Sequence, residues 1–195
     1  MRETIHPFIV RATHWINAVA VVIMILSGWQ IYNAAPIFPF SFPAWMTLGG
    51  WLGGALQWHF AAMWLLMANG LAYLAYGVLS GRIGTRFFPI SPAEVAHDLR
   101  DALKGKLSHD NPAHYNGVQK LFYVGVIAAL IAVVLSGLAI WKPVQLWWLT
   151  ALFGGFQGAR LVHFLAMAAI VGFLLVHVVM ALLVPKTIRA MVFGR

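Results

Sequence analysis

The chain contains no cysteine, and this absence removes several classes of chemistry at once. Disulfides, thiolate catalysis, iron–sulfur clusters and covalently attached c-type haem all need cysteine sulfur. Charge is also scarce, because Asp, Glu, Lys and Arg make up 9% of the residues, against about 25% in soluble domains. A chain that is 62% hydrophobic is therefore expected in a membrane rather than in water.

Acidic residues are the scarcer charged class, with five Asp and Glu against thirteen Lys and Arg. A basic excess can indicate nucleic-acid binding, but here the basic residues fall in short clusters between apolar runs, so no nucleic-acid partner is expected. The sequence shows no internal repeat and no low-complexity tract. The first apolar run has no clear small-residue cleavage site, so we expect it to remain as a helix rather than to be removed as a signal peptide.

Four apolar stretches reach the roughly 20 residues that cross a bilayer core. Because an isolated strand cannot satisfy its backbone in lipid, each stretch is expected to be a helix. The predicted fold is all-α: an integral membrane four-helix bundle that forms a single domain over residues 1–195. The predicted helices cover about 14–32, 58–79, 121–140 and 161–184.

The basic residues also predict an orientation. Eleven of the thirteen fall at the two termini or in the 80–120 connection, and only Lys142 and Arg160 remain for the other side. The positive-inside rule therefore places both termini and the central connection in the cytoplasm of a multi-pass bacterial inner-membrane protein. Within that connection, SPAEVAHDLRDALKGKL predicts a short amphipathic helix on the inner surface. The first outer loop, about 33–57, carries no charged residue.

Four of the eight histidines lie in or at the ends of the predicted spans: His14, His59, His163 and His177. Ionisable groups in a span are candidates for function, although each histidine alone fits equally well as a helix-packing residue with a backbone partner. His163 and His177 share one helix face and are separated by about 21 Å along the axis, too far for one metal ion to bridge. The topology pairs His14 with His177 near the cytoplasm and His59 with His163 near the outer surface.

Two histidines at each of two depths are what two bis-imidazole b-type haems require. Two axial imidazoles saturate each iron, so such haems carry electrons and no catalytic residue is expected. Small residues would let the macrocycle approach the helices, or would only help the helices pack; they are Ser27-Gly28, Gly125, Ser136-Gly137 and Gly172. Arg11 and Lys120 inside, and Arg160 outside, are candidate partners for the haem propionates or ordinary interfacial anchors. Asn69 is expected to bond a neighbouring helix.

Taken together, these residues resemble a known family over nearly the whole length of the chain. The family is that of the diheme cytochrome b (gamma) subunits of respiratory formate dehydrogenases, nickel–iron hydrogenases and thiosulfate reductases. RATHWINAV resembles the family's Arg-x-x-His-Trp element in the first helix, and HYNGVQKLFY resembles the Tyr-Asn-x-x-Gln-Lys element before the third. The histidine pair of the fourth helix, followed by LLVPKTIRAMV, is similar to the family's last helix and exit.

The resemblance implies an electron-transfer subunit of a respiratory oxidoreductase with quinone redox activity. Such a subunit connects the quinone pool with a periplasmic partner, here a molybdopterin oxidoreductase as first choice and a hydrogenase as second. It also implies a quinone site near the inner haem, formed by Asn116, Gln119 and Lys120 close to His177. For Asn116, a helix N-cap fits equally well, and both roles are compatible. Val118 stands where formate dehydrogenase members have glycine, and Gly117 lies one place earlier.

Two other functions compete with this reading. A stand-alone diheme cytochrome b that oxidises superoxide and reduces quinone resembles the chain in helices one, two and four. Its third helix tends to begin with histidines, whereas this chain has Tyr115, Asn116, Gln119 and Lys120 there. A haem-free membrane transporter or structural protein that uses the histidines for protons or packing belongs to another class.

Overall fold

The computed structural model describes residues 6–104 and 116–194, which form eight α-helices and one short 3₁₀ helix and contain no strand. Four helices are long and apolar enough to cross a membrane: α1 (Phe8–Ala34), α2 (Leu52–Leu79), α5 (Gly117–Trp141) and α7 (Gly155–Leu183). The predicted all-α class and the four spans are confirmed. Each helix begins four to six residues before its predicted span, whereas the C-terminal ends agree within two residues. Hydropathy detects only the stretch that matches the bilayer core, whereas helices continue into the interfacial region.

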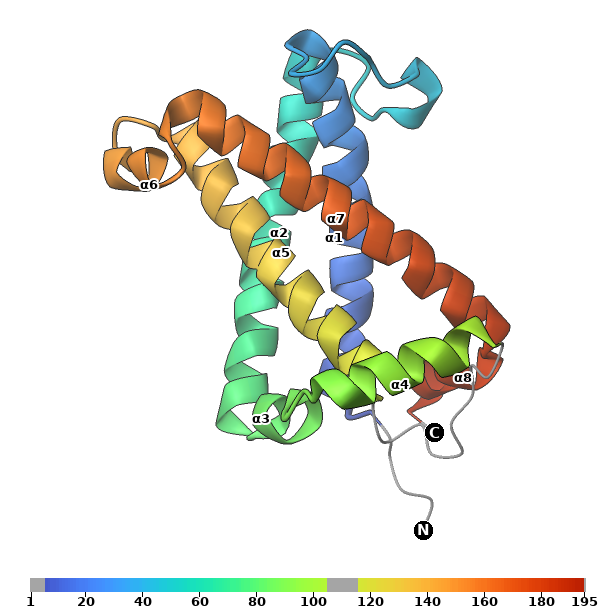
Figure 1. The fold of residues 1–195 in the computed structure, drawn as a ribbon. Coiled ribbons are helices and arrows are strands. Elements are labelled where there is room, and N and C mark those ends of the chain that lie inside the picture. Colours follow the sequence, from blue (N-terminus) through green and yellow to red (C-terminus); the bar gives the residue numbers. More distant parts are fainter. Residues whose placement is uncertain (1–5, 105–115, 195) are drawn as a thin grey trace. The chain divides into compact units, whose positions relative to one another are not determined.

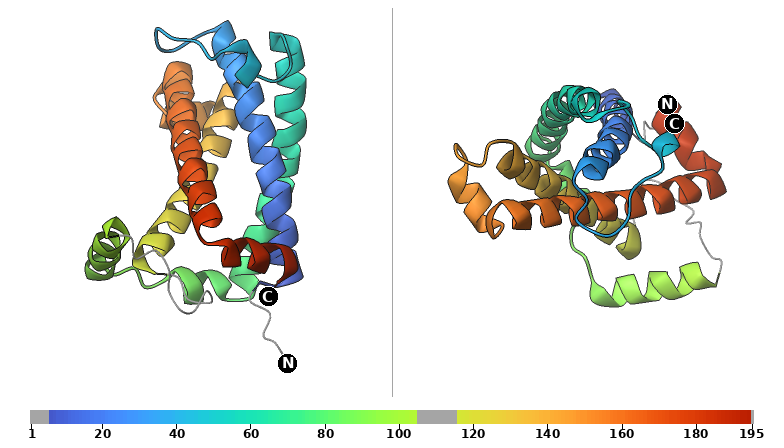
Figure 2. Two further views of the ribbon diagram at one scale, coloured as in Figure 1. Left: turned by 90° about the vertical axis from the view of Figure 1, so that its right-hand side faces the viewer. Right: turned by 90° about the horizontal axis from the view of Figure 1, so that it is seen from above.

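The chain divides into two compact units, one formed by residues 7–76 and the other by residues 1–6 and 77–195. The first unit is a hairpin of α1 and α2, which run side by side in both side views (Figures 1 and 2). The loop between them contains the 3₁₀ helix η1 (Ala44–Met46). Asn69 of α2 donates to the carbonyl of Thr13 at 2.7 Å and to Asn17 Oδ1 at 2.6 Å, both on α1. Asn69 therefore bonds a neighbouring helix, as predicted.

The loop after α1 is fixed to that helix by side-chain hydrogen bonds. Asn33 accepts from the backbone N–H of Phe42 and donates to its carbonyl, both at 2.8 Å. The Tyr32 hydroxyl bonds the backbone N–H and carbonyl of Phe38 in the same way. The rings of Trp29 and Phe42 stack with centroids 4.6 Å apart. The uncharged outer loop is thus an ordered aromatic structure.

In the second unit, α5 packs along α7, and four short helices lie at their ends (Figure 1). The short helix α6 (Trp147–Leu152) joins them through a core of Ala139, Leu149 and Ala159, all at most 3% exposed. Thr150 of α6 donates to the carbonyl of Ala139 at 3.2 Å. The turn into α7 needs positive φ at two successive residues, and glycine supplies both, at Gly154 and Gly155.

Three further helices accompany the opposite ends of these spans: α3 (Arg82–Phe87), α4 (Pro92–Leu103) and α8 (Pro185–Phe193). Helix α4 is the amphipathic helix that the sequence predicts between the second and third spans, and it packs on α5. Helices α3, α6 and α8 were not predicted from the sequence. Tyr115, named above, lies outside the described part of the chain.

Candidate functional site

In the first unit, His59 of α2 is held against α1 by a serine–glycine pair. The Nδ1 atom of His59 lies 3.0 Å from Oγ of Ser27. The next residue is Gly28, where an added Cβ would lie 3.4 Å from Cε1 of the same ring. Ser27 is completely buried. The imidazole ring therefore packs closely against α1 at two small residues, Ser27 and Gly28.

The second unit repeats this arrangement between α5 and α7. The Nδ1 atom of His163 lies 3.2 Å from Oγ of Ser136 and 2.9 Å from the carbonyl oxygen of Val133. A Cβ added at Gly137 would lie 3.1 Å from Cε1 of His163. Ser136, like Ser27, has no exposed surface. We call each serine, glycine and histidine set a histidine seat.

The two histidine seats define corresponding positions in the two hairpins, although the sequence alone shows no internal repeat. His14 lies thirteen residues before Ser27 in α1, and Tyr123 lies thirteen residues before Ser136 in α5. Tyr73 lies fourteen residues after His59 in α2, and His177 lies fourteen residues after His163 in α7. Each hairpin therefore carries one histidine in its seat and a second one about four helical turns away. The second histidine is on the first helix of one hairpin (His14 in α1) and on the second helix of the other (His177 in α7).

The two histidines away from the seats have aromatic neighbours. His177 stacks on Phe173, with ring centroids 5.4 Å apart and an interplanar angle of 13°. Phe173 also meets Tyr123 edge-on at 6.5 Å. In the first unit, His14 meets Trp15 edge-on at 5.4 Å. These flat, apolar surroundings suit an aromatic ligand more than a hydrated ion.

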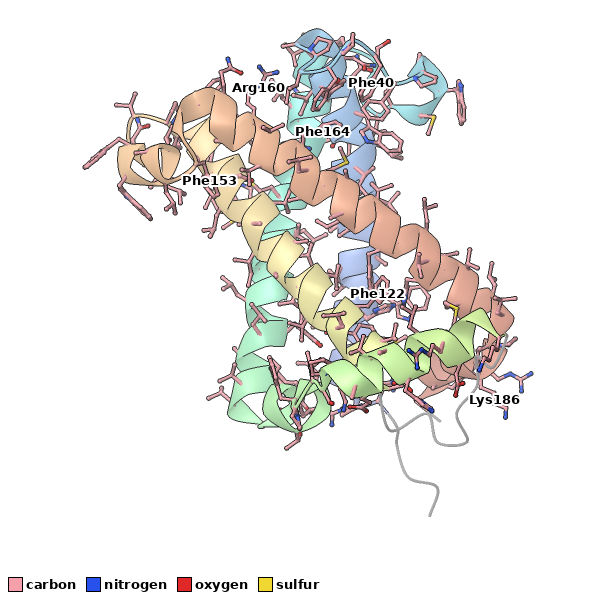
Figure 3. The ribbon with its side chains drawn as sticks, in the orientation of Figure 1. Phe40, Phe122, Phe153, Arg160, Phe164 and Lys186 are labelled. Carbon is pink, nitrogen blue, oxygen red and sulfur yellow. The ribbon has the colours of Figure 1, made fainter. Side chains whose placement is uncertain are left out.

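Two of the candidate propionate partners stand three residues before a histidine. Arg11 precedes His14 in α1, and Arg160 precedes His163 in α7. Residues three apart lie on one helix face, so each guanidinium and its histidine project to the same side. Arg160 donates to Gln157 Oε1 at 3.0 Å, and Figure 3 labels it on the part of α7 nearest α6. Lys186, beyond the other end of α7, marks the opposite level.

The residues predicted to bind quinone lie together at the start of α5. Asn116 is the N-cap: its Oδ1 accepts from the backbone N–H of Gln119 at 2.8 Å, and Gln119 Oε1 accepts from the Asn116 N–H at 3.2 Å. The N-cap alternative for Asn116 is therefore confirmed. Lys120 donates to the Pro89 carbonyl at 3.3 Å and lies 3.4 Å from Glu94 of α4.

Sequence reasoning missed the contribution of α4 to this end of α5. Asp98 accepts from the backbone N–H of Gly117 at 2.7 Å, which satisfies one of the orphan donors at the start of the helix. The carboxylate also lies where the helix dipole favours negative charge. The signal was present as two carboxylates, Glu94 and Asp98, spaced four residues apart on one face of an amphipathic helix.

Comparison with known proteins assigns the family. Prokaryotic cytochrome b561 matches residues 5–194 of the chain. The chain belongs to the prokaryotic cytochrome b561 family. It is also 56% identical over 190 residues to a putative protein-methionine-sulfoxide reductase subunit, YedZ1, from Azospira oryzae, a match that covers 97% of this chain and 96% of the relative.

As a cytochrome b561 family member, the chain is a multi-pass protein of the bacterial inner membrane and a b-type haem protein that transfers electrons. The described residues fit such a haem. A b-type haem is held only through its axial ligands and its surroundings, and the spans offer four imidazoles as axial donors. The seats at Gly28 and Gly137 hold an imidazole close to the helix backbone, and at Gly137 a Cβ would come within 3.1 Å of the ring.

Proposed function

We propose that this chain is a diheme b-type cytochrome that carries electrons across the membrane between the quinone pool and a periplasmic oxidoreductase. The observation that carries the proposal is the repeated histidine seat, because each hairpin holds one imidazole by Nδ1 at the same level of the helix pair. We assign His59 and His163 to the iron of an outer haem, and His14 and His177 to that of an inner haem. Each bis-imidazole haem would exchange one electron at a time.

The assigned arginines support this arrangement. Arg160 and Arg11 each share a helix face with one assigned ligand, three residues away, and a guanidinium pairs well with a carboxylate. We assign Arg160 to a propionate of the outer haem and Arg11 to one of the inner haem. Lys120, whose ammonium already lies 3.4 Å from Glu94, is assigned to the inner haem or to the quinone.

We place quinone binding at the start of α5, near His177, with both termini in the cytoplasm. The capping box uses the side-chain oxygens of Asn116 and Gln119. Their NH₂ groups are therefore the donors that would reach a quinone oxygen. In this arrangement a single turn of helix serves both as the cap of α5 and as the quinone contact.

The isosteric change Asn116→Asp separates these two roles. Aspartate is as good an N-cap as asparagine and suits the positive end of the helix dipole, so α5 should begin as before. The variant loses the NH₂ donor, and we expect reduction of the haems by a soluble quinol analogue to slow by roughly tenfold, the worth of one hydrogen bond. Stopped-flow absorbance measures this rate. A dithionite-reduced spectrum identical to the parent's is the control, and an unchanged quinol rate would leave Asn116 with the capping role alone.

The periplasmic partner we propose is a molybdopterin reductase that acts on methionine sulfoxide. The support is the 56% identity to a protein named as a methionine-sulfoxide reductase subunit, over nearly the full length of both chains. The reaction balances with a quinol as donor: sulfoxide reduction to the thioether takes two electrons and two protons and releases water, and one quinol supplies both. A hydrogenase is the less supported partner, because nothing in the relative's name points to hydrogen.

The first outer loop is the surface that we assign to this partner. It carries no charge, and its backbone is held by the paired bonds of Asn33 and Tyr32. Trp45 and Trp51 are exposed, at 83% and 68%. Large exposed aromatic side chains on an ordered loop are typical anchors of protein interfaces.

The test of the proposed function is made on the purified protein in detergent. We expect a reduced α-band of b-type haem, two haems per chain by pyridine haemochrome, and reduction of both by a quinol analogue. Reoxidation should then require the partner reductase and methionine sulfoxide. Preparations without the α-band would support the haem-free transporter, and haems that superoxide reduces without any partner would support the stand-alone cytochrome.

A further inference from the structure

The hydrogen-bond donors and acceptors around the two seat histidines determine which ring nitrogen carries the proton. A serine hydroxyl has a single proton to donate. Ser27 directs it at the carbonyl of Ile23, with an Oγ–O distance of 2.6 Å, and Ser136 directs it at the carbonyl of Ala132, also at 2.6 Å. Each Oγ can then only accept from the imidazole that faces it. The Nδ1 atoms of His59 and His163 therefore carry the ring proton, and Nε2 carries the lone pair.

The second seat reaches the same result by an independent route. His163 Nδ1 lies 2.9 Å from the carbonyl oxygen of Val133, which can only accept. The Nδ1 proton of His163 is therefore shared between the Val133 carbonyl and Ser136 Oγ at 3.2 Å. Two acceptors in different directions restrict the rotation of the ring about its Cβ–Cγ bond more than one acceptor does.

A histidine in this tautomer is prepared to bind a metal through Nε2. The group that accepts from Nδ1–H orients the ring and makes the imidazole a stronger donor. A stronger donor stabilises the ferric form of a haem iron more than the ferrous form, which lowers the reduction potential. The seat serines are completely buried, so water does not compete for either bond.

We infer that Ser27 and Ser136 are positioning residues of the outer haem: they hold His59 and His163 in the Nδ1–H tautomer, fix their ring planes and lower the potential of that haem. The inference rests on the proposed function, in which these two histidines are the outer ligands. It adds that the inner haem, ligated by His14 and His177, is not controlled by these serines. The serines thus set the outer haem's potential separately from the inner one.

The test measures haem content, the two midpoint potentials and the low-spin ferric EPR signals of Ser27→Ala and Ser136→Ala. We expect two haems per chain, a rise in the midpoint potential of one haem only, and a change in the g-values of that haem as its imidazole planes turn. Both variants should shift the midpoint potential of the same haem. In Ser136→Ala the Val133 carbonyl still accepts from His163, so that histidine should remain bound.

Two further variants separate positioning from a purely structural role. Ser27→Thr keeps a hydroxyl that bonds the carbonyl four residues earlier, and it should restore the parent potential. Thr13→Val removes a different buried hydroxyl of α1, one that bonds the carbonyls of Ile9 at 2.8 Å and Val10 at 3.2 Å. This control should leave the outer haem's potential unchanged.

The outcomes distinguish the inference from the function on which it rests. A parent protein without two haems would overturn the proposed function. Two haems with unshifted potentials and g-values in both alanine variants would overturn the inference alone, as would shifts in two different haems. If Ser27→Ala loses haem altogether, Ser27→Thr decides: recovery of both haems supports the hydroxyl, and failure to recover them overturns its role.

Discussion

Replacing His163 by alanine is expected to lower the haem content from two per chain to one. The imidazole at this position is the one that the second seat holds, by Ser136 and the Val133 carbonyl, and alanine offers no donor to iron. The remaining haem should keep its midpoint potential because its assigned ligand on the same helix, His177, lies about 21 Å further along the axis. Pyridine haemochrome assay and a redox titration of the α-band measure both quantities.

The pairing of ligands makes this expectation sharper. His59→Ala should remove the same haem as His163→Ala, whereas His14→Ala and His177→Ala should both remove the other one. His97→Ala is the matched control, because His97 is exposed on α4 and contacts Asp98, outside the spans. Depletion of the same haem by His14→Ala and His59→Ala would show that the pairing is wrong.

The spans and the N-cap of α5 were predictable because they depend on local sequence. A run of apolar residues long enough for a bilayer can only be a helix there, and Asn116 with Gln119 is a capping box by spacing alone. The amphipathic α4 follows from the same kind of local pattern. The short helices α3, α6 and α8 escape such reasoning because six to nine residues give no usable periodicity.

The histidine seats depend instead on how two helices meet. Ser27 and His59 are 32 residues apart, and only the antiparallel hairpin brings them to one level. The match appears only with the helix bounds of the structure, where Ser27 lies seven residues before the end of α1 and His59 seven after the start of α2. The predicted spans ended at about 32 and began at about 58, so they did not reveal it. From the sequence, the Ser-Gly pairs were expected either to admit a macrocycle or to help the helices pack, whereas in the structure they lie against the imidazoles.

Gly137→Ala is expected to disturb the outer haem, whereas Gly28→Ala is not. A Cβ at residue 137 would lie 3.1 Å from Cε1 of His163, closer than ordinary side-chain contacts, and 3.4 Å from its Nδ1. The ring cannot turn aside cheaply, because its Nδ1 is bonded to Ser136 and to the carbonyl of Val133. Nor can the helices part easily, since Ala139 and Ala159 are completely buried where α5 and α7 pack beside α6.

At Gly28 the same substitution meets ordinary contact distances. The new Cβ would lie 3.4 Å from Cε1 and 3.8 Å from Nδ1 of His59, so the ring can stay where it is. Alanine also favours a helix over glycine by about 1 kcal/mol in water. Gly28→Ala should therefore keep two haems with parental potentials and a thermal stability in detergent at least equal to the parent's.

The pair of variants tests the seat with one chemical change at two places. Gly137→Ala should shift the g-values and the potential of the outer haem, and the larger Gly137→Val should remove that haem while the inner one stays. Haem content and EPR measure both effects, and Gly28→Ala serves as the control for adding a methyl group to a span. If Gly137→Val retained both haems with unchanged potentials, the position of His163 against α5 would not determine haem binding. In that case the close approach of glycine to imidazole would serve helix packing alone.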